Sequence, residues 1–219
     1  MTLPALVIFD CDGVLVDSEA IANETLAEAL TALGLAMTGA EARRRFVGLS
    51  LKTMCRQLTD EFGLALPPGW ADEVEARDFA AFRARLQPVS GVEQLIEAVD
   101  AAGVKKCVAS SGSFAKMDVT LGVTGLKRRF DEVIFNASQV AHGKPAPDLF
   151  LYAADRMGVA PGACVVIEDS IHGVVGARAA GMRVIGYCGD ILTDRAALER
   201  AGAEIVTAMD EIPRLIGIS

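Results

Sequence analysis

Short, continuously apolar segments alternate along most of the chain with longer segments whose apolar residues recur every three to four positions. Short apolar runs bounded by turn residues are typical of strands buried on both faces of a sheet, and the periodic segments are typical of amphipathic helices. Strands are predicted at residues 5–9, 104–110, 132–135, 164–168, 184–187 and 204–206. Helices are predicted at residues 91–102, 114–123, 147–157, 171–180, 194–201 and 209–216. This alternation predicts an α/β fold with a parallel sheet covered on both faces.

The segment between residues 19 and 86 breaks the alternation, because it contains helical patterns and no convincing strand. Its helices are predicted at residues 20–33, 40–46, 51–62 and 71–86, with turn signals at Gly34, Gly48 and residues 67–69. An all-helical block inserted after the first strand predicts a second domain, a cap over the site. We therefore expect a Rossmann-like parallel-sheet core at residues 1–17 and 88–219 and a helical cap, which selects the substrate, at residues 18–87.

Composition narrows the classes of partner. Hydrophobic residues make up 52% of the chain and charged residues 23%, which predicts a packed core. The net charge of −8 argues against a nucleic-acid partner and means that an anionic substrate must be attracted by a local feature, such as a metal ion. No apolar run approaches the roughly 20 residues that span a bilayer, and the N-terminus lacks a signal-peptide layout. The scattered cysteines are interpreted as reduced core thiols, so a cytoplasmic protein acting as a single chain is expected.

Two aspartates, Asp10 and Asp12, follow the first predicted strand directly. Regular structure has ended there, so both carboxylates can point into one cleft. Like charges about 4 Å apart repel by roughly 1–4 kcal/mol at intermediate dielectric. A divalent cation relieves that repulsion, or one carboxyl stays protonated and serves as an acid, and both solutions suit phosphoryl transfer. The alternative is an ordinary turn after a strand, where Asp and Gly are common.

A second acidic pair, Glu168 and Asp169, ends the strand predicted at residues 164–168. Adjacent carboxylates at a strand end are costly without a cation, and their hard oxygen atoms are the ligands that Mg²⁺ selects. The alternative is a helix start, in which Asp169 or Ser170 caps the helix that follows. Capping and metal binding do not exclude each other.

Two further loops carry groups that bind anions. Ser110 and Ser111 end a predicted strand and precede a helix, where a hydroxyl group and backbone N–H groups form an anion site. Lys144 is held by neighbouring prolines just ahead of the next helix, where it supplies a fixed positive charge. Alone, each feature is equally typical of a helix cap or of a solvated surface lysine.

The four segments occur in order, each in a loop after a predicted strand. The pattern DxDGxxxDS at residues 10–18, with the distant KPxPD at 144–148 and Glu-Asp at 168–169, resembles the haloacid dehalogenase-like hydrolases. Within that superfamily the chain is similar to the group of β-phosphoglucomutase, phosphoglycolate phosphatase and the sugar-phosphate phosphatases. The resemblance covers essentially the whole chain, including a helical cap inserted after the first motif.

The resemblance implies a role for each matching residue. Asp10 would attack phosphorus and form an aspartyl-phosphate, and Asp12 would act as general acid and then as general base. Mg²⁺ would be held by Asp10, the backbone carbonyl of Asp12 and Asp169, with Glu168 in or next to the coordination shell. Ser110, Ser111 and Lys144 would bind the phosphoryl oxygens of a small phosphate ester. The presence of Asp12 favours phosphate chemistry over dehalogenation, because the departure of a halide needs no protonation.

Three functions compete. The first is a phosphatase acting on a small phosphorylated metabolite such as a sugar phosphate. The second is a sugar phosphomutase, but the histidine and arginine of that resemblance fall here on Ala22 and Leu51. The third is a non-catalytic binding protein, which has no reason to retain mutually repelling carboxylates. The identity of the metabolite cannot be predicted from these residues.

Other residues that could take part in chemistry are interpreted as structural or solvent-exposed. Cys11 is predicted to point into the core, and His142 and His172 are interpreted as loop and local hydrogen-bonding residues. The basic run at Arg43, Arg44 and Arg45 in the predicted cap is interpreted as a solvated face that could also meet an anionic substrate.

Overall fold

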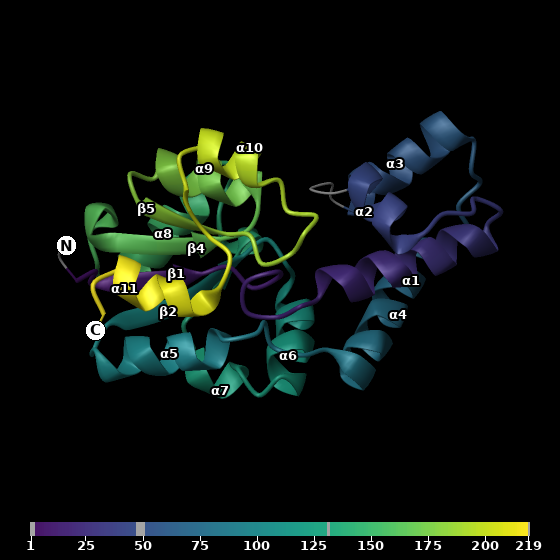
Figure 1. Cartoon of the computed structure of the whole chain (residues 1–219). Coiled ribbons are helices and arrows are strands. Elements are labelled where there is room, and N and C mark those ends of the chain that lie inside the picture. The colour runs from purple at the N-terminus through teal and green to yellow at the C-terminus, as the bar shows by residue number, and fades with distance from the viewer. Residues whose placement is uncertain (1–2, 47–50, 131, 219) are drawn as a thin grey trace. The chain divides into compact units, whose positions relative to one another are not determined.

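The computed structural model describes residues 3–46, 51–130 and 132–218, so the turn predicted at Gly48 lies outside the described residues. The chain divides into two compact units, one of Met1–Asp17 with Gln87–Ser219 and one of Ser18–Leu86. We call them the core unit and the helical unit (Figure 1). Gln87, which we expected in the helical cap, belongs to the core unit. The functional division between catalysis and substrate selection stays a prediction.

The described part of the core unit is built on one six-stranded sheet. The strands lie in the order β3-β2-β1-β4-β5-β6, and every neighbouring pair is parallel. Their bounds are β1 Leu6–Phe9, β2 Lys105–Ser110, β3 Ile134–Asn136, β4 Cys164–Glu168, β5 Arg183–Tyr187 and β6 Glu204–Val206. This is the order of a doubly wound Rossmann-like sheet, so the predicted fold class is confirmed.

Helices cover both faces of the sheet, with α8, α9 and α10 on one side and α5, α6 and α7 on the other (Figure 1). The helix predicted at residues 209–216 is divided into a 3-10 turn and α11, and Pro213 lies in the first turn of α11, where a missing N–H is tolerated. The helical elements of the core unit are α5 Val92–Ala101, α6 Phe114–Val123, α7 Lys127–Phe130, η1 Ala137–Gln139, α8 Asp148–Arg156, η2 Pro161–Ala163, α9 Ile171–Ala179, α10 Arg195–Arg200, η3 Met209–Glu211 and α11 Ile212–Leu215. Of these, α7, η1 and η2 were not predicted, because three or four residues are too few to show a periodicity.

The central strand β1 is buried on both faces, as predicted. Leu6 and Ile8 pack in one cluster with residues of α8 and α9. Phe9 points to the opposite face and meets the ring of Phe130 of α7 edge-on, with ring centroids 5.6 Å apart. Burial of each of these side chains contributes roughly 1.5–3 kcal/mol, and a shift of register by one residue would exchange the two faces. The packing of β1 therefore fixes the position of the residue that follows it, Asp10.

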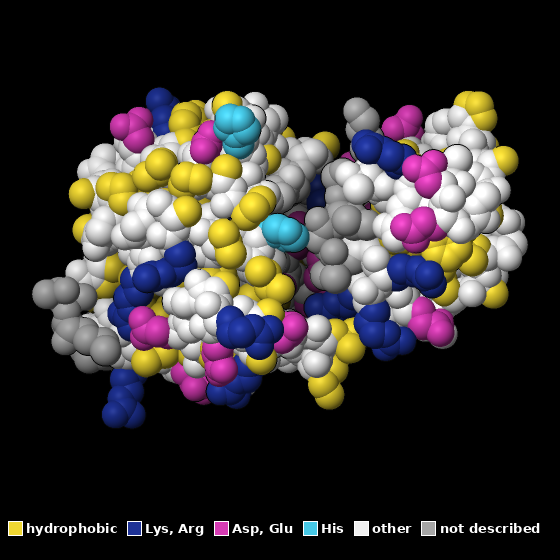
Figure 2. Space-filling model, turned by 90° about the horizontal axis from the view of Figure 1, so that it is seen from above, with side chains coloured by type: hydrophobic (Ala, Val, Ile, Leu, Met, Phe, Trp, Pro, Cys, Tyr) yellow, Lys and Arg dark blue, Asp and Glu magenta, His cyan; other side chains and the backbone are white. Residues whose placement is uncertain are grey.

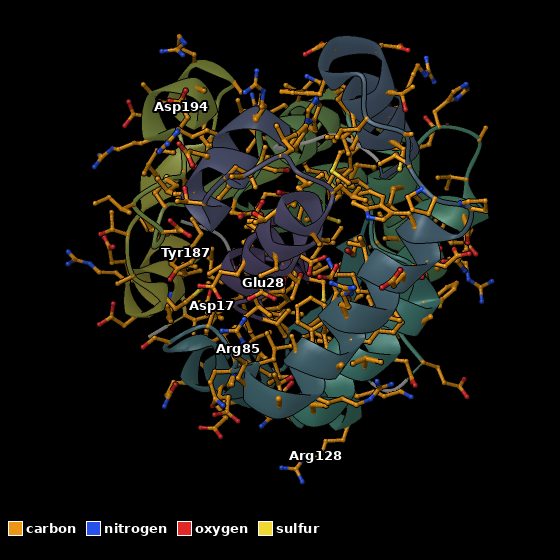
Figure 3. The ribbon with its side chains drawn as sticks, turned by 90° about the vertical axis from the view of Figure 1, so that its right-hand side faces the viewer. Asp17, Glu28, Arg85, Arg128, Tyr187 and Asp194 are labelled. Atoms are coloured by element: carbon orange, nitrogen blue, oxygen red, sulfur yellow. The ribbon has the colours of Figure 1, made fainter. Side chains whose placement is uncertain are left out.

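The helical unit has its own hydrophobic core and consists of α1 Glu19–Ala32, α2 Gly39–Phe46, α3 Leu51–Phe62 and α4 Trp70–Arg85. The buried members of that core come from all four helices: Leu26, Ala27, Ala29, Leu30, Ala42, Phe46, Met54, Leu58, Trp70 and Val74. Polar contacts also join α1 to α4, from Thr25 to Asp78 and from Arg85 (labelled in Figure 3) to Glu24 at 2.8 Å. The inserted all-helical domain of the predicted fold is confirmed.

The basic run of α2 is not uniformly solvated, which corrects the sequence interpretation. The Arg43 residue is only 8% exposed, and its guanidinium lies 3.9 Å from the carboxylate of Glu19. Arg44 and Arg45 are exposed, and the Arg45 guanidinium stacks over the ring of Phe62 at 4.4 Å. One turn of helix thus carries an arginine that packs inside the unit and two that face solvent.

The chain leaves and re-enters the core unit through one short ladder. The Asp17 N–H donates to the Gln87 carbonyl at 3.1 Å, and the Val89 N–H donates to the Leu15 carbonyl at 3.0 Å. Val16 and Pro88 form an antiparallel bridge between them. The two connections are therefore held together by the core unit itself.

Figure 2 looks onto the side of the core unit that α8, α9 and α10 cover, and shows hydrophobic side chains lying among charged ones. Exposed hydrophobic residues there include Leu151 of α8 and Ile171 and Val175 of α9.

Among the described residues, none of the helices combines the length and the hydropathy needed to cross a membrane.

Candidate active site

The candidate site begins where strand order reverses, between β1 and β4. The two strands pair in parallel with Phe9 opposite Ile167, and the Asp10 N–H donates to the Ile167 carbonyl at 3.0 Å. Asp10 and Glu168 therefore leave the sheet side by side at the carboxyl ends of their strands. In open α/β sheets, this switch point is where ligands bind.

Three carboxylates converge at this edge of the sheet. Asp10, Glu168 and Asp169 each offer an oxygen atom, and these atoms all lie within 4.8 Å of one another. Gly13 allows the approach of Asp169, because a Cβ on Gly13 would lie 2.0 Å from Asp169 Oδ2 and its φ of +77° favours glycine. A compact set of hard oxygen donors fits Mg²⁺ in both chemistry and spacing.

Lys144 lies inside this cluster rather than on the surface. Its Nζ donates to Asp10 Oδ1 at 2.7 Å and to Glu168 Oε1 at 2.5 Å, and its side chain is 4% exposed. Burial by itself would lower the pKa of Lys144, but the carboxylates of Asp10 and Glu168 outweigh it and raise that pKa. Lys144 is therefore a permanently charged member of the site.

The loop that carries Lys144 is held by close backbone packing. The Lys144–Pro145 peptide bond is cis. Gly176 of α9 lies against the same loop, since a Cβ there would be 2.9 Å from the Ala146 carbonyl oxygen. The Lys144 ammonium also lies 5.2 Å from the ring centroid of Phe150 in α8. These contacts keep the lysine in place.

The charge of Asp10 is only partly compensated by these residues. Burial raises the pKa of Asp10, Lys144 opposes that rise, and Glu168 and Asp12 add to it, so that the pKa reaches about 7. The single charge of Lys144 does not offset burial together with the charges of Glu168 and Asp12. A further positive charge at this site would favour the ionised, nucleophilic form of Asp10.

Glu168 is fully buried and anchored by hydrogen bonds. Its Oε2 accepts from the Asp169 and Ser170 N–H groups at 3.0 Å and from Ser170 Oγ at 2.9 Å. Ser170 Oγ also accepts from the Gly173 N–H at 3.0 Å. Of the two predicted caps of α9, Ser170 is therefore the one that caps the helix, and Asp169 belongs to the acidic cluster. A Cβ on Gly173 would lie 1.8 Å from Glu168 Oε1, so that position accepts only glycine without a shift.

The carboxylate of Asp12 points elsewhere. Among the described residues, the acidic group comprises Asp10, Glu168 and Asp169 and leaves the Asp12 side chain out. Asp12 Oδ1 instead lies 2.9 Å from Lys116 Nζ of α6. The sequence assigned Asp12 to metal binding through its backbone carbonyl, which stays a prediction. Sequence reasoning missed Lys116. A lysine in the first turn of a predicted helix is unfavourably placed, and that signal could have identified it.

Ser110 and its turn lie beside Asp12. Ser110 is 1% exposed, and its Oγ accepts from the Gly112 N–H at 3.0 Å. The buried side chain of Asn136, a second residue that sequence reasoning missed, donates from Nδ2 to the Gly112 carbonyl at 3.2 Å. A Cβ on Gly112 would lie 3.3 Å from Ser110 Oγ and 3.4 Å from Asp12 Oδ2. Ser111 is exposed on the same turn.

Cys11, His142 and His172, which the sequence did not assign to the site, are not members of the acidic group formed by the described residues. Cys11 is fully buried, and its thiol is 3.9 Å from Thr120 Oγ1. Burial, and then the Asp12 and Asp10 charges, raises the pKa of the Cys11 thiol far above its ordinary value. His142 is exposed and lies 3.2 Å from Asp148, and His172 is exposed on α9.

Tyr187, at the end of β5, is a further residue that the sequence did not single out. Burial raises the pKa of its phenol, and the charges of Asp17, Asp190 and Asp169 add to that rise. Tyr187 and Asp17 are both labelled in Figure 3. A Cβ on Gly189 would lie 2.0 Å from Tyr187 Oη, so the loop after β5 packs closely on the phenol.

Comparison with known proteins gives consistent matches. A family model for haloacid dehalogenase-like hydrolases matches residues 7–187. The chain is 31% identical over 185 residues to 6-phosphogluconate phosphatase of Escherichia coli, covering 84% of this chain and 82% of that protein. It is 30% identical over 210 residues to a phosphorylated carbohydrates phosphatase of Thermotoga maritima, covering 94% and 95%. A crystal structure of a HAD family hydrolase from Deinococcus radiodurans, with bound phosphate and sodium, is 33% identical with a TM-score of 0.84, covering 99% and 98%.

Proposed function

Because this chain belongs to the haloacid dehalogenase-like hydrolase family, we propose that it is a Mg²⁺-dependent phosphatase of phosphorylated carbohydrates or related small metabolites. It is an enzyme of the phosphoric monoester hydrolase class. The names of its relatives, one a 6-phosphogluconate phosphatase and one a phosphorylated carbohydrates phosphatase, support the choice of substrate class. The reaction proceeds through an aspartyl-phosphate on Asp10.

One observation carries this proposal. Asp10, Glu168, Asp169 and Lys144 come from three separate segments of the chain and meet at one point of the sheet edge. Burying three carboxylates together is unfavourable unless the site binds a cation. An anionic phosphate drawn into an acidic protein needs the same local positive charge.

Asp10 and Asp169, with the backbone carbonyl of Asp12 and with Glu168 beside them, would hold the Mg²⁺. The bound ion supplies positive charge that offsets the negative charge of the phosphoryl group. Lys144 contributes a fixed charge of the same sign from within the protein, and Ser110 and Ser111 bind the phosphoryl oxygens. These contacts act in the transition state, where they lower the barrier most.

Asp10 and Asp12 have different roles in the reaction. An Asp10 oxygen attacks phosphorus and forms an aspartyl-phosphate, while the bond from phosphorus to the ester oxygen breaks. Asp12 gives its proton to the departing oxygen, so that an alcohol leaves and Asp12 becomes a carboxylate. Asp12 then takes a proton from water as that water attacks the aspartyl-phosphate. Inorganic phosphate and free Asp10 are the products.

We assign substrate selection to the helical cap at residues 18–87 and catalysis to residues 1–17 and 88–219. We further place the enzyme in the cytoplasm as a single chain. Its five free cysteines suit a reducing compartment. Light scattering on the purified protein tests the oligomeric state, and a dimer would contradict it.

A screen of phosphate release tests the proposed function. Sugar phosphates including 6-phosphogluconate, phosphoglycolate and nucleotides are each incubated with the enzyme, with Mg²⁺ and with EDTA in its place. We expect phosphate release from a sugar phosphate that EDTA abolishes and Mg²⁺ restores. Interconversion of sugar phosphates without phosphate release would instead establish a phosphomutase. No release from any ester would refute the phosphatase.

A further inference from the structure

Lys116 occupies a position that local helix energetics disfavour. It is the third residue of α6, and its backbone N–H donates to the N-cap Ser113 Oγ at 3.1 Å. The first turn of α6 contains no acidic residue. Unpaired N–H groups give a helix N-terminus a partial positive charge, so a cation there is repelled. A residue that breaks a local rule is often retained for a functional reason.

The partner of Lys116 lies in a distant segment of the chain. Lys116 Nζ is 2.9 Å from Asp12 Oδ1, in the loop after β1. The Lys116 side chain is 26% exposed and the Asp12 side chain 17%, so the pair is largely shielded from water. The same helix also contacts that loop through Thr120, whose Oγ1 lies 3.9 Å from the Cys11 thiol.

The second oxygen of Asp12 lies on the side of the Ser110 turn. A Cβ on Gly112 would be 3.4 Å from Asp12 Oδ2, 3.3 Å from Ser110 Oγ and 3.6 Å from Lys116 Cδ. The Asp12 carboxylate is thus placed between the ammonium of Lys116 and the turn that carries the phosphate-binding serine. Rotation of that carboxylate would break the contact of Lys116 with Oδ1.

We propose that Lys116 is a positioning residue: it holds Asp12 Oδ1 and thereby keeps Oδ2 beside the Ser110 turn, where Asp12 exchanges its proton with the leaving oxygen. This inference rests on the proposed function, because it assigns Asp12 the role of general acid. Lys116 contacts Asp12 and not the reacting atoms. Its loss misplaces the acid and leaves the nucleophile Asp10 and its partner Lys144 in place.

The two classes of ester respond differently to a misplaced acid. Without protonation a sugar would have to leave as an alkoxide, which is a poor leaving group, so its departure needs the proton of Asp12. A p-nitrophenyl group leaves as a stabilised phenolate and needs that proton much less. Loss of Lys116 therefore slows the hydrolysis of an alkyl phosphate more than the hydrolysis of p-nitrophenyl phosphate.

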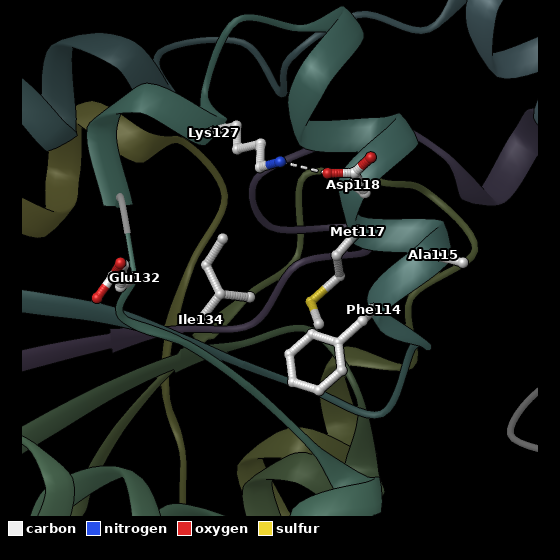
Figure 4. A pocket seen from close by; sticks show the side chains of 7 residues that line it. All are labelled: Phe114, Ala115, Met117, Asp118, Lys127, Glu132 and Ile134. Carbon is white, nitrogen blue, oxygen red and sulfur yellow. Dashed lines mark hydrogen bonds and ion pairs between the residues drawn. The ribbon is translucent and has the colours of Figure 1, made fainter.

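The experiment compares Lys116→Met, Lys116→Arg and the control Lys127→Met. Lys127 is also a core-unit lysine paired with an aspartate, Asp118, but it lines a separate pocket with Phe114 and Met117 (Figure 4). Each variant is assayed for kcat and KM on p-nitrophenyl phosphate and on the sugar phosphate that the wild-type enzyme hydrolyses fastest. Circular dichroism confirms folding, and Lys116→Gln serves as a second neutral variant.

For Lys116→Met we expect kcat on the sugar phosphate to fall roughly 10- to 100-fold, part of the contribution of a general acid, with less than about a threefold fall on p-nitrophenyl phosphate. Lys116→Arg should restore most of the loss, and Lys127→Met should match the wild type. An equal fall on both esters, or no fall on either, would overturn the inference. A wild-type enzyme that hydrolyses neither ester would instead refute the proposed function.

A double substitution separates positioning from direct substrate binding. In an Asp12→Asn background, the residual activity on p-nitrophenyl phosphate should not change when Lys116→Met is added, because the residue on which Lys116 acts is already gone. A further fall in that background, or a rise in KM, would show that Lys116 touches the substrate itself and would overturn the positioning role.

Discussion

Both units of the chain contain locally paired charges, but among the described residues the core unit alone also gathers three carboxylates at one point. In the helical unit, charges are satisfied locally, as in the pairs Arg85–Glu24 and Arg43–Glu19. In the core unit, Asp10, Glu168 and Asp169 come together with Lys144 as their buried cation. Opposite charges that pair within a unit compensate each other, whereas like charges gathered at the edge of the sheet need a bound ion of opposite charge. A cluster of mutually repelling carboxylates that a fold retains therefore indicates a functional site.

The substitution Asp10→Asn is expected to have the largest effect. An amide cannot attack phosphorus, so phosphate release should fall by at least roughly 10⁴-fold. The buried fold should persist, because the amide has nearly the same shape. Phosphate release and thermal unfolding of the same preparation measure the two effects. Retained turnover with a good substrate would contradict the assignment of the reaction to Asp10 of the core unit.

Next in size is Lys144→Met, which leaves the three carboxylates without their internal cation. Activity should fall roughly 10²- to 10³-fold, and the metal-free protein should lose about 3–5 kcal/mol of stability. Added Mg²⁺ should raise the melting temperature of this variant more than that of the wild type. The exposed pair Lys127–Asp118 provides the control, because Lys127→Met should change neither quantity appreciably.

Leu30→Ala tests whether the helical unit is held together by its own core. Leu30 is fully buried there, and its truncation should cost about 2–5 kcal/mol. Hydrogen exchange should accelerate in α1 and α4 and stay unchanged in the sheet of the core unit. The matched variant Leu95→Ala in α5 should give the reverse pattern. Identical exchange in both variants would mean that the two units unfold as one.

The stability of the metal-free protein should fall as the pH rises from about 4 to about 7. The folded-state pKa of Asp10 is raised to about 7, so the folded protein binds a proton that the unfolded chain has already released. The loss is on the order of a few kcal/mol. Mg²⁺ competes with that proton, so its stabilising effect should be larger at pH 8 than at pH 5. Urea unfolding in EDTA measures the slope, which should be much smaller in Asp10→Asn.

The smallest expected effect is that of Arg45→Gln in the helical unit. Loss of its stacking over Phe62 should cost about 0.5–1 kcal/mol, since the site is exposed. The turnover number should stay within experimental error of the wild type. Arg44→Gln, an exposed neighbour on the same helix, is the control. A large fall in turnover for Arg45→Gln alone would show that the helical unit also contributes to catalysis.

Much of the fold could be predicted because it follows local rules. Every strand was found within two residues at either end. The rule that a strand buried on both faces is continuously apolar applies best to β1 and β4, which are buried throughout. The short helix α7 escaped, because four residues carry too little periodicity to identify a face. The division of the last helix at Pro213 also escaped, although proline favours a helix start.

The candidate site could be predicted wherever it follows a strand directly. Asp10, Glu168 and Asp169 were located by that rule, since parallel strands end at the same edge of the sheet. Lys116 and Asn136 were not, because a contact between distant segments depends on how α6 and β3 pack beside the loop after β1.

The ladder at Leu15–Asp17 and Gln87–Val89 makes the helical unit exchangeable. Its ends are pinned by backbone hydrogen bonds within the sheet-bearing frame, so that frame closes without help from the insert. A short turn, or a foreign segment whose termini lie equally close, could join Asp17 to Gln87 and leave the strand order intact. The chain thus has a point at which a whole segment could be replaced without a change to the sheet.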